Sequence, residues 1–168
     1  MQKAARYFNL IFTVVVVALL LSKVPGWYRQ WSMENEGAPD FSLALVDGGE
    51  FVLSAQKQKR VLLFWATWCG PCSLELARVN RMIAGGELKP EQVLAISIGE
   101  TAEVVKSAIA ERKYTFPVAL DLDGKVAESF KVSGTPTIVF VDEKQVINWL
   151  STGLSPSLGL RLQRFLRE

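Results

Sequence analysis

The chain has 168 residues, enough for one ordinary domain and a short appendage, and nearly half of them are apolar. Its 19 basic and 17 acidic residues almost cancel, which gives no sign of a nucleic-acid-binding surface. It has no histidine and only two cysteines. The missing histidine excludes Ser-His and Cys-His catalytic arrangements and metal sites that need imidazole, while two cysteines exclude a scaffold held by several disulfides.

The N-terminus carries a nearly unbroken apolar run from Tyr7 to Leu21, preceded by Lys3 and Arg6. At ~1.5 Å per residue this run spans about 22 Å of a ~30 Å hydrocarbon core, and extension to Val24 makes up much of the difference. Basic residues on the N-terminal side favour leaving that end in the cytoplasm. We therefore predict an uncleaved signal anchor, a membrane helix, over residues 1–24.

Two other interpretations of this segment remain open. A cleaved signal peptide needs small residues near the cut, and the nearest candidate, Val24-Pro25-Gly26, is poor because Pro25 intervenes. A buried core helix is disfavoured by the basic leader and the terminal position. Residues 25–37 contain proline and glycine and read as a linker, with Trp27, Tyr28 and Trp31 suited to a membrane interface.

Strands and helices alternate from Ala38 to the end of the chain. The expected strands are residues 41–46, 50–53, 60–66, 92–98, 116–121, 137–142 and 145–150. The expected helices are residues 69–83, 102–112, 126–130 and 157–166. Asp47-Gly48-Gly49 makes the first strand pair an N-terminal β-hairpin. The alternation of strands and helices predicts a parallel core, and the tight last strand pair predicts an antiparallel edge. We therefore expect residues 38–168 to form one α/β domain with a central mixed β-sheet flanked by helices.

The two cysteines stand three apart, as Cys69-Gly70-Pro71-Cys72, between a predicted strand and a predicted helix. Free N–H groups and the dipole at a helix N-terminus favour thiolate over thiol, which makes Cys69 the expected nucleophile. Cys72, one turn later, can resolve a mixed disulfide. Pro71 suits the first helical turn because its missing N–H is not needed there. A C-x-x-C pair in this context indicates redox chemistry.

A zinc half-site or two buried structural thiols are the other interpretations of this pair. Zinc needs four ligands, and the chain offers two cysteines and no histidine. Buried thiols do not explain the surrounding Trp68-Cys69-Gly70-Pro71-Cys72 sequence. We therefore expect no metal and no cofactor beyond a redox-active Cys69–Cys72 disulfide.

A second motif, Gly134-Thr135-Pro136-Thr137, precedes a predicted strand. Proline is tolerated at the first residue of a strand. Because cis peptides are uncommon even before proline, the residues alone predict a trans Thr135–Pro136 bond.

Residues 65–72, Trp-Ala-Thr-Trp-Cys-Gly-Pro-Cys, resemble the active site of the thioredoxin superfamily, and the TlpA/ResA-like membrane-anchored thioredoxins in particular. Ala38-Pro39-Asp40-Phe41-Ser42-Leu43 matches their redoxin start, and residues 123–127 and 130–137 match their second half. The resemblance covers about residues 38–168 and implies a thioredoxin-like fold. It also implies that Pro136 is a cis-proline that packs on the redox pair and, with Thr135, offers backbone to substrate.

The same resemblance implies a function. Such proteins are single-pass proteins of the cytoplasmic membrane, with the catalytic domain on the extracytoplasmic (periplasmic) side. They reduce disulfides in exported proteins, including cytochrome c precursors, and take electrons from a membrane thiol donor. Gly70-Pro71 departs from the Glu-Pro often found at ResA-like sites, so the cytochrome c assignment and the direction of exchange stay open. Trp65 and Trp68 are expected to be structural, with shielding of the disulfide and contact with substrate as a further role open to Trp68.

Glu75 matches an active-site glutamate of ResA-like proteins. Its i, i+3 spacing from Cys72 places both on one helix face, so it can tune thiol protonation. A solvated glutamate in a first helical turn is the alternative.

Two other functional classes compete with thiol–disulfide exchange. A peroxide-reducing redoxin needs an arginine and a threonine beside its cysteine; Thr67 is present, but no arginine is close in sequence. A copper metallochaperone on the same fold needs histidine beside its cysteines. The spacing of Cys69 and Cys72 favours exchange, with protein disulfides and thiols as partners.

Overall fold

The computed structural model describes residues 11–18 and 33–167. The chain divides into two compact units, Met1–Ser32 and Met33–Glu168. In the first unit residues 11–18 are helical, and the rest of the predicted membrane helix over residues 1–24 lies outside the described residues, as do linker residues 25–32. Within the described ranges, we find no helix that is both long and apolar enough to cross a membrane.

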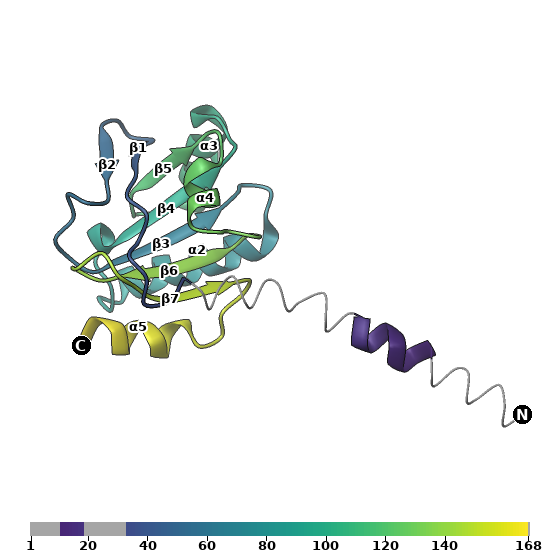
Figure 1. Ribbon diagram of the computed structural model, residues 1–168. Coiled ribbons are helices and arrows are strands. Elements are labelled where there is room, and N and C mark those ends of the chain that lie inside the picture. Colours follow the sequence, from purple (N-terminus) through teal and green to yellow (C-terminus); the bar gives the residue numbers. More distant parts are fainter. Residues whose placement is uncertain (1–10, 19–32, 168) are drawn as a thin grey trace, which may run out of the picture. The chain divides into compact units, whose positions relative to one another are not determined.

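The second unit is built on a five-stranded sheet (Figure 1). Its strands are β3 (Arg60–Trp65), β4 (Val93–Ile98), β5 (Val118–Asp121), β6 (Thr137–Val141) and β7 (Ile147–Thr152), in the order β5-β4-β3-β6-β7. β3, β4 and β5 are parallel, whereas β6 is antiparallel to β3 and β7 is antiparallel to β6. The parallel core and antiparallel edge are therefore confirmed.

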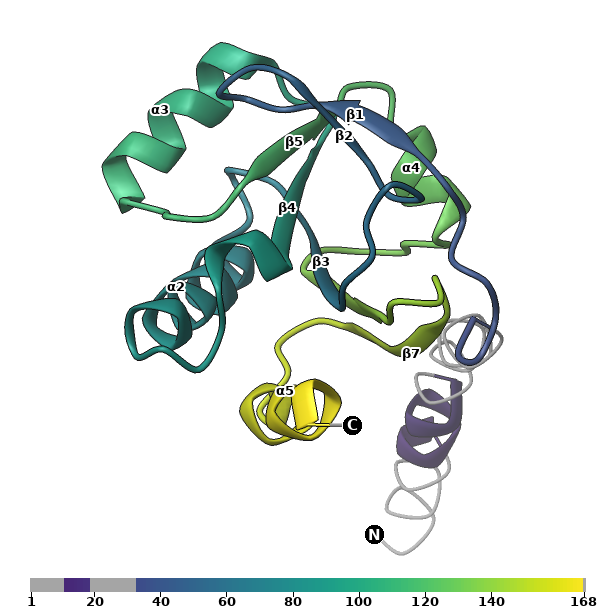
Figure 2. The ribbon, with the colours of Figure 1, turned by 90° about the vertical axis from the view of Figure 1, so that its left-hand side faces the viewer.

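Helices cover both faces of this sheet, as Figure 2 shows. They are α2 (Gly70–Ala84), the 3-10 turn η1 (Pro90–Gln92), α3 (Ala102–Arg112), α4 (Lys125–Ser129) and α5 (Leu158–Arg167). All six β3 residues are buried, which explains the unbroken apolar run. Val61, Leu63 and Trp65 face a core shared with α2, α3 and α5. Leu62 and Phe64 face a second core with α4 and the first two strands.

The first two strands are shorter than predicted. β1 (Ser42–Ala44) and β2 (Glu50–Val52) pair antiparallel. Gly48 and Gly49 have φ angles of 99° and 84° in the connecting turn, a conformation that glycine adopts without steric cost. The Val46 amide donates to the Val118 carbonyl at 2.9 Å, which attaches this pair beside β5.

Residues 33–37, placed by sequence in the linker, are part of the second unit. Met33 is 5% exposed and packs in the second core. The Asn35 amide donates to the Ile147 carbonyl at 2.7 Å, and the Ile147 amide donates to the Glu36 carbonyl at 2.9 Å. These bonds cover the outer edge of β7. Periodicity missed the segment because it forms single contacts rather than a strand.

Most strand ends of the sheet differ from the prediction by one or two residues, and two of the starts differ for local reasons. β5 begins at Val118 rather than residue 116, because Pro117 has no N–H for a ladder. β7 begins at Ile147 rather than residue 145, because Asp142 accepts from the Lys144 and Val146 amides, both at 2.9 Å. These bonds, with Gln145 at φ 64°, lengthen the turn.

Candidate active site

Cys69 lies between the end of β3 and the start of α2, where it is the N-cap residue of the helix. Its amide donates to the Ala66 carbonyl at 3.2 Å, which closes the turn after β3. Its sulfur accepts from the Cys72 amide at 3.2 Å, so the helix N-terminus is aimed at Sγ. That geometry stabilises negative charge on Cys69.

Cys69 and Cys72 form a disulfide. Cys69 is 6% exposed, whereas Cys72 is fully buried. The small exposed part of Cys69 is therefore the point at which a substrate sulfur can approach. Trp68, Gly70 and Pro71 are exposed around it, and Trp68 leaves 78% of its surface open.

The second motif lies directly against the first. The Cys69 sulfur is 3.6 Å from the Thr135 carbonyl oxygen. The Thr135–Pro136 peptide is cis, so the trans bond predicted from the residues alone is wrong and the cis-proline implied by the resemblance is found. The motif is also tied internally, because Thr137 Oγ1 donates to the Gly134 carbonyl at 2.7 Å. The fold thus brings together two motifs 66 residues apart.

Glu75 is not a solvated glutamate. Its side chain is 1% exposed and shares the buried face of α2 with Cys72. Glu75 Oε1 accepts from the Ser155 amide at 2.9 Å, and Oε2 lies 3.3 Å from Arg78 Nη1. Arg78 Nη1 also donates to the Ser155 carbonyl at 2.6 Å. The carboxylate is thus fixed to the segment that leads into α5.

Sequence reasoning missed a set of bonds around Thr67, two residues before Cys69. The Thr67 amide and hydroxyl donate to the two carboxylate oxygens of Glu100, at 2.9 and 2.5 Å. Ser97 Oγ donates to the same carboxylate at 2.7 Å, and Arg112 Nη2 donates to the Thr67 carbonyl at 3.0 Å. We call Glu100, Ser97 and Arg112 together the Thr67 clamp.

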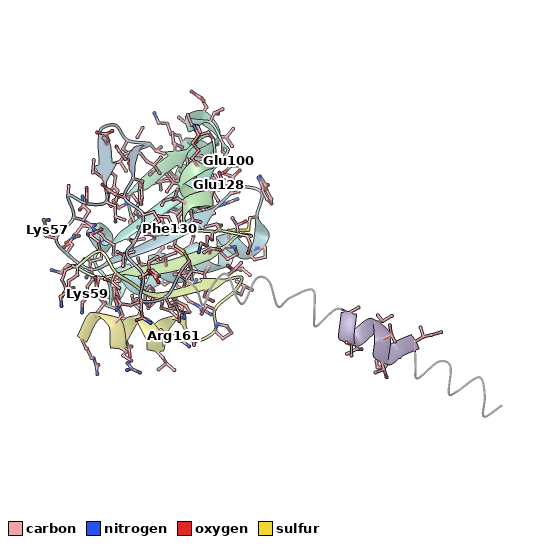
Figure 3. The ribbon with its side chains drawn as sticks, viewed as in Figure 1. Lys57, Lys59, Glu100, Glu128, Phe130 and Arg161 are labelled. Carbon is pink, nitrogen blue, oxygen red and sulfur yellow. A yellow bond between two sulfur atoms is a disulfide. The ribbon has the colours of Figure 1, made fainter. Side chains whose placement is uncertain are left out.

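The Thr67 clamp could not be found by spacing, because Glu100 and Arg112 are 33 and 45 residues from Thr67. Glu100 follows β4 and Arg112 ends α3. The clamp therefore fixes residues 66–69, the loop between β3 and α2 that we call the redox loop, to both ends of α3. Figure 3 shows Glu100 at the end of the sheet opposite Lys57 and Lys59. Only the sheet topology could have indicated this contact. Because β3 and β4 are parallel neighbours, Thr67 after β3 and Glu100 after β4 lie at the same edge of the sheet.

The arrangement is suited to thiol chemistry. It offers an N-cap sulfur, a second sulfur one turn later and an adjacent carbonyl. Over residues 11–18 and 33–167, no group of three or more Cys, Asp or Glu side chains gathers to hold a metal ion.

Comparison with known proteins places this geometry in context. The model of the AhpC/TSA family matches residues 35–150. The protein named thiol-disulfide oxidoreductase ResA of Oceanobacillus iheyensis is 34% identical over 165 residues, covering 95% of this chain and 84% of that protein. The ResA protein of Geobacillus thermodenitrificans is 31% identical over 154 residues, covering 86% and 88% respectively.

Two solved structures are similar in fold. A proposed thiol:disulfide interchange protein DsbE from Chlorobium tepidum superimposes with a TM-score of 0.70 and 28% identity, over 80% of this chain and 95% of that chain. The thioredoxin domain of a thiol-disulfide oxidoreductase from Bacteroides vulgatus gives a TM-score of 0.68 at 21% identity, over 79% and 97%. Both share the thioredoxin-like fold described above.

Proposed function

Because this chain belongs to the AhpC/TSA family, as a protein–disulfide oxidoreductase of the ResA type, we propose that Cys69 and Cys72 are its redox pair and reduce disulfides in exported proteins. The observation that carries the proposal is the position of Cys69. Its sulfur accepts a hydrogen bond from the α2 N-terminus at 3.2 Å and lies 3.6 Å from Thr135. A nucleophilic thiolate and a backbone platform for substrate thus stand side by side.

The proposed reaction has two steps. The Cys69 thiolate attacks one sulfur of the substrate disulfide, and the other substrate sulfur leaves as a thiolate that takes up a proton. The Cys72 thiolate then attacks Cys69 and releases the second substrate sulfur. Two electrons pass from the protein dithiol to the substrate, and a membrane thiol donor then restores the dithiol.

We further propose that residues 1–24 anchor the protein in the cytoplasmic membrane and that the domain from Met33 onward works on the extracytoplasmic side, joined by residues 25–32. Support comes from the apolar run behind Lys3 and Arg6. Apocytochrome c is one substrate within this proposal. An extracytoplasmic location fits this substrate, because cysteine pairs become oxidised to disulfides in oxidising compartments.

The reduction potential of the Cys69–Cys72 pair tests the direction of exchange. Equilibration of a chain from Met33 onward with glutathione, followed by tryptophan fluorescence, is the measurement. We expect a value at or below ~−230 mV, toward the thioredoxin end, as a reductase requires. The Cys72→Ser variant is the control, because it cannot form the internal disulfide. A value near ~−120 mV would identify an oxidant like DsbA and contradict the proposed direction.

Peroxide reduction is a second candidate, favoured by one observation. Arg112, distant in sequence, donates to the Thr67 carbonyl at 3.0 Å and so supplies an arginine beside the redox loop. The Thr67 hydroxyl, however, is bonded to Glu100. Hydrogen peroxide consumption by the reduced protein, compared with Cys69→Ser, decides between the two: rapid consumption without a protein substrate supports the peroxidase.

A further inference from the structure

A groove of about 520 Å³ lies beside the redox loop. Thr67 and Trp68 line one side, and α3 lines the other with Glu103, Val104, Ser107 and Glu111. Cys69 does not line the groove, but it directly follows the lining residue Trp68, so a substrate segment that leaves the groove past Trp68 leads toward the redox pair. The groove is therefore a place where a protein substrate can be recognised beyond its disulfide.

The α3 residues in the groove form one stripe. Positions 103, 104, 107 and 111 share a helix face at about 100° per residue, and Lys106, one turn after Glu103, lies at the border of this face. The cation that lines the groove is Arg112, whose Nη2 is already bonded to the Thr67 carbonyl. Arg112 is thus held by the redox loop, and Lys106 is a second cation beside Glu103, whereas Glu111 lines the far end of the stripe.

The groove also exposes apolar surface. Trp68 is 78% exposed and Val104 is 49% exposed. A single exposed apolar side chain is ordinary, but here two of them line one groove beside the redox pair. A partner side chain placed between them would remove apolar area from water.

The two carboxylates are set at a defined separation. Glu103 and Glu111 are eight positions apart, about 12 Å along the helix, which an extended chain covers in about four residues. The pKa of Glu103 is lowered below its usual value, because its own backbone amide, the Thr101 hydroxyl and the Lys106 ammonium all favour the carboxylate.

We infer that this groove binds a basic segment of the protein substrate, with an apolar side chain between Trp68 and Val104 and a lysine or arginine facing each of Glu103 and Glu111. This rests on the proposed function, and it names the class of substrate: cationic polypeptide around the disulfide. Charge complementarity at such an exposed surface increases the association rate of the right substrate and disfavours substrates of the wrong charge.

The test uses the reduced full chain in a neutral detergent and three synthetic peptides. Each peptide carries one cysteine in a mixed disulfide with 2-mercaptoethanol, an adjacent leucine and two variable positions about four residues apart, occupied by Lys, Gln or Glu. Reduction yields peptide thiol and 2-mercaptoethanol while Cys69 and Cys72 become a disulfide. Tryptophan fluorescence gives the second-order rate constant.

At low salt we expect the Lys peptide to react about tenfold faster than the Glu peptide, with the Gln peptide between them. At ~1 M salt, where the Debye length is about 3 Å, this ratio falls toward one. Glu103→Gln combined with Glu111→Gln removes the ratio at low salt. The matched control Glu143→Gln, which removes one carboxylate from the exposed turn between β6 and β7, retains it.

Bis(2-hydroxyethyl) disulfide, a small neutral substrate, separates the two proposals. Its rate constant stays the same in all these variants if the groove acts on the peptide alone. The proposed binding of a basic segment in the groove is overturned if the three peptides react at equal rates. It is also overturned if the ratio of rates persists in the double variant with Glu103→Gln and Glu111→Gln. Failure to reduce even the small disulfide overturns the proposed function instead.

Discussion

Glu75 is a carboxylate on the α2 face that carries Cys72, and its side chain is almost completely buried. It is satisfied by the Ser155 amide and by Arg78. A negative charge close to a thiol disfavours the thiolate and raises its pKa. At the scale of single residues, we therefore expect Glu75 to adjust the protonation of the redox pair.

Replacement of Glu75 by Gln tests that role. The amide oxygen can still accept from the Ser155 amide, so the fold is retained while the charge is removed. We expect the pH midpoint for iodoacetamide alkylation of the reduced thiols to fall, because the like charge is gone. Glu143→Gln is the control. Unchanged titration curves for both thiols would remove Glu75 from the mechanism.

Tyr114 is 8% exposed and packs against Trp65, with ring centroids 6.0 Å apart. Its hydroxyl is buried near the Arg112 guanidinium. Burial raises its pKa above the usual 10, and this outweighs the opposing effect of Arg112. The folded state therefore holds the neutral phenol more strongly than the unfolded chain does.

This linkage has a definite sign. Below pH ~10 the phenol is neutral in both states and its contribution to stability is complete. As the pH rises through 10 the unfolded state ionises first, so stability falls. We expect Tyr114→Phe to lose less unfolding free energy between pH 9 and 11 than the parent, because it has no phenol to ionise in the unfolded state. Urea unfolding of the oxidised proteins at a series of pH values measures this loss; parallel pH curves for parent and variant would contradict it.

At the scale of elements, β7 is the outer strand of the sheet and needs cover. An uncovered edge strand presents unpaired N–H and C=O groups to other chains. Residues 33–37 supply that cover through the bonds of Asn35 and Glu36 with Ile147, and through burial of Met33. The domain therefore begins structurally before Ala38.

Two truncated chains test this boundary. A chain from Met33 and a chain from Ala38 differ only in the five covering residues. We expect the shorter chain to be about 2 kcal/mol less stable in urea, because it loses the bonds of Glu34, Asn35 and Glu36 to β7 and the apolar contacts of Met33, offset by the entropy of ordering the segment. Coincident unfolding midpoints would mean that the cover adds nothing to stability.

At the scale of the whole molecule, local pattern predicted the elements well and their joints poorly. The range of α3 was predicted to the residue, and the β3 run was recognised from its continuous apolar character. The turn at Asp142 and the start of β5 at Val118 were missed. Both depend on single groups, a capping carboxylate and a proline without an N–H, and these leave no trace in the spacing of apolar residues.

The candidate site divides in the same way. Cys69 and Cys72 are local in sequence, so spacing sufficed to find them. The position of Thr135 against Cys69 came from resemblance, since no local rule joins residues 66 apart. The burial of Glu75 and the Thr67 clamp depend on which elements become neighbours, and the sequence alone did not state that.

The Thr67 clamp also bears on how this enzyme can be recombined with its relatives. Glu100 and Arg112 bracket α3, and both bond Thr67 in the redox loop. A chimera that exchanges residues 65–72 alone would place a foreign loop on partners that did not evolve with it. A functional exchange therefore requires two separate segments of the chain, residues 65–72 and residues 97–112, to be replaced together.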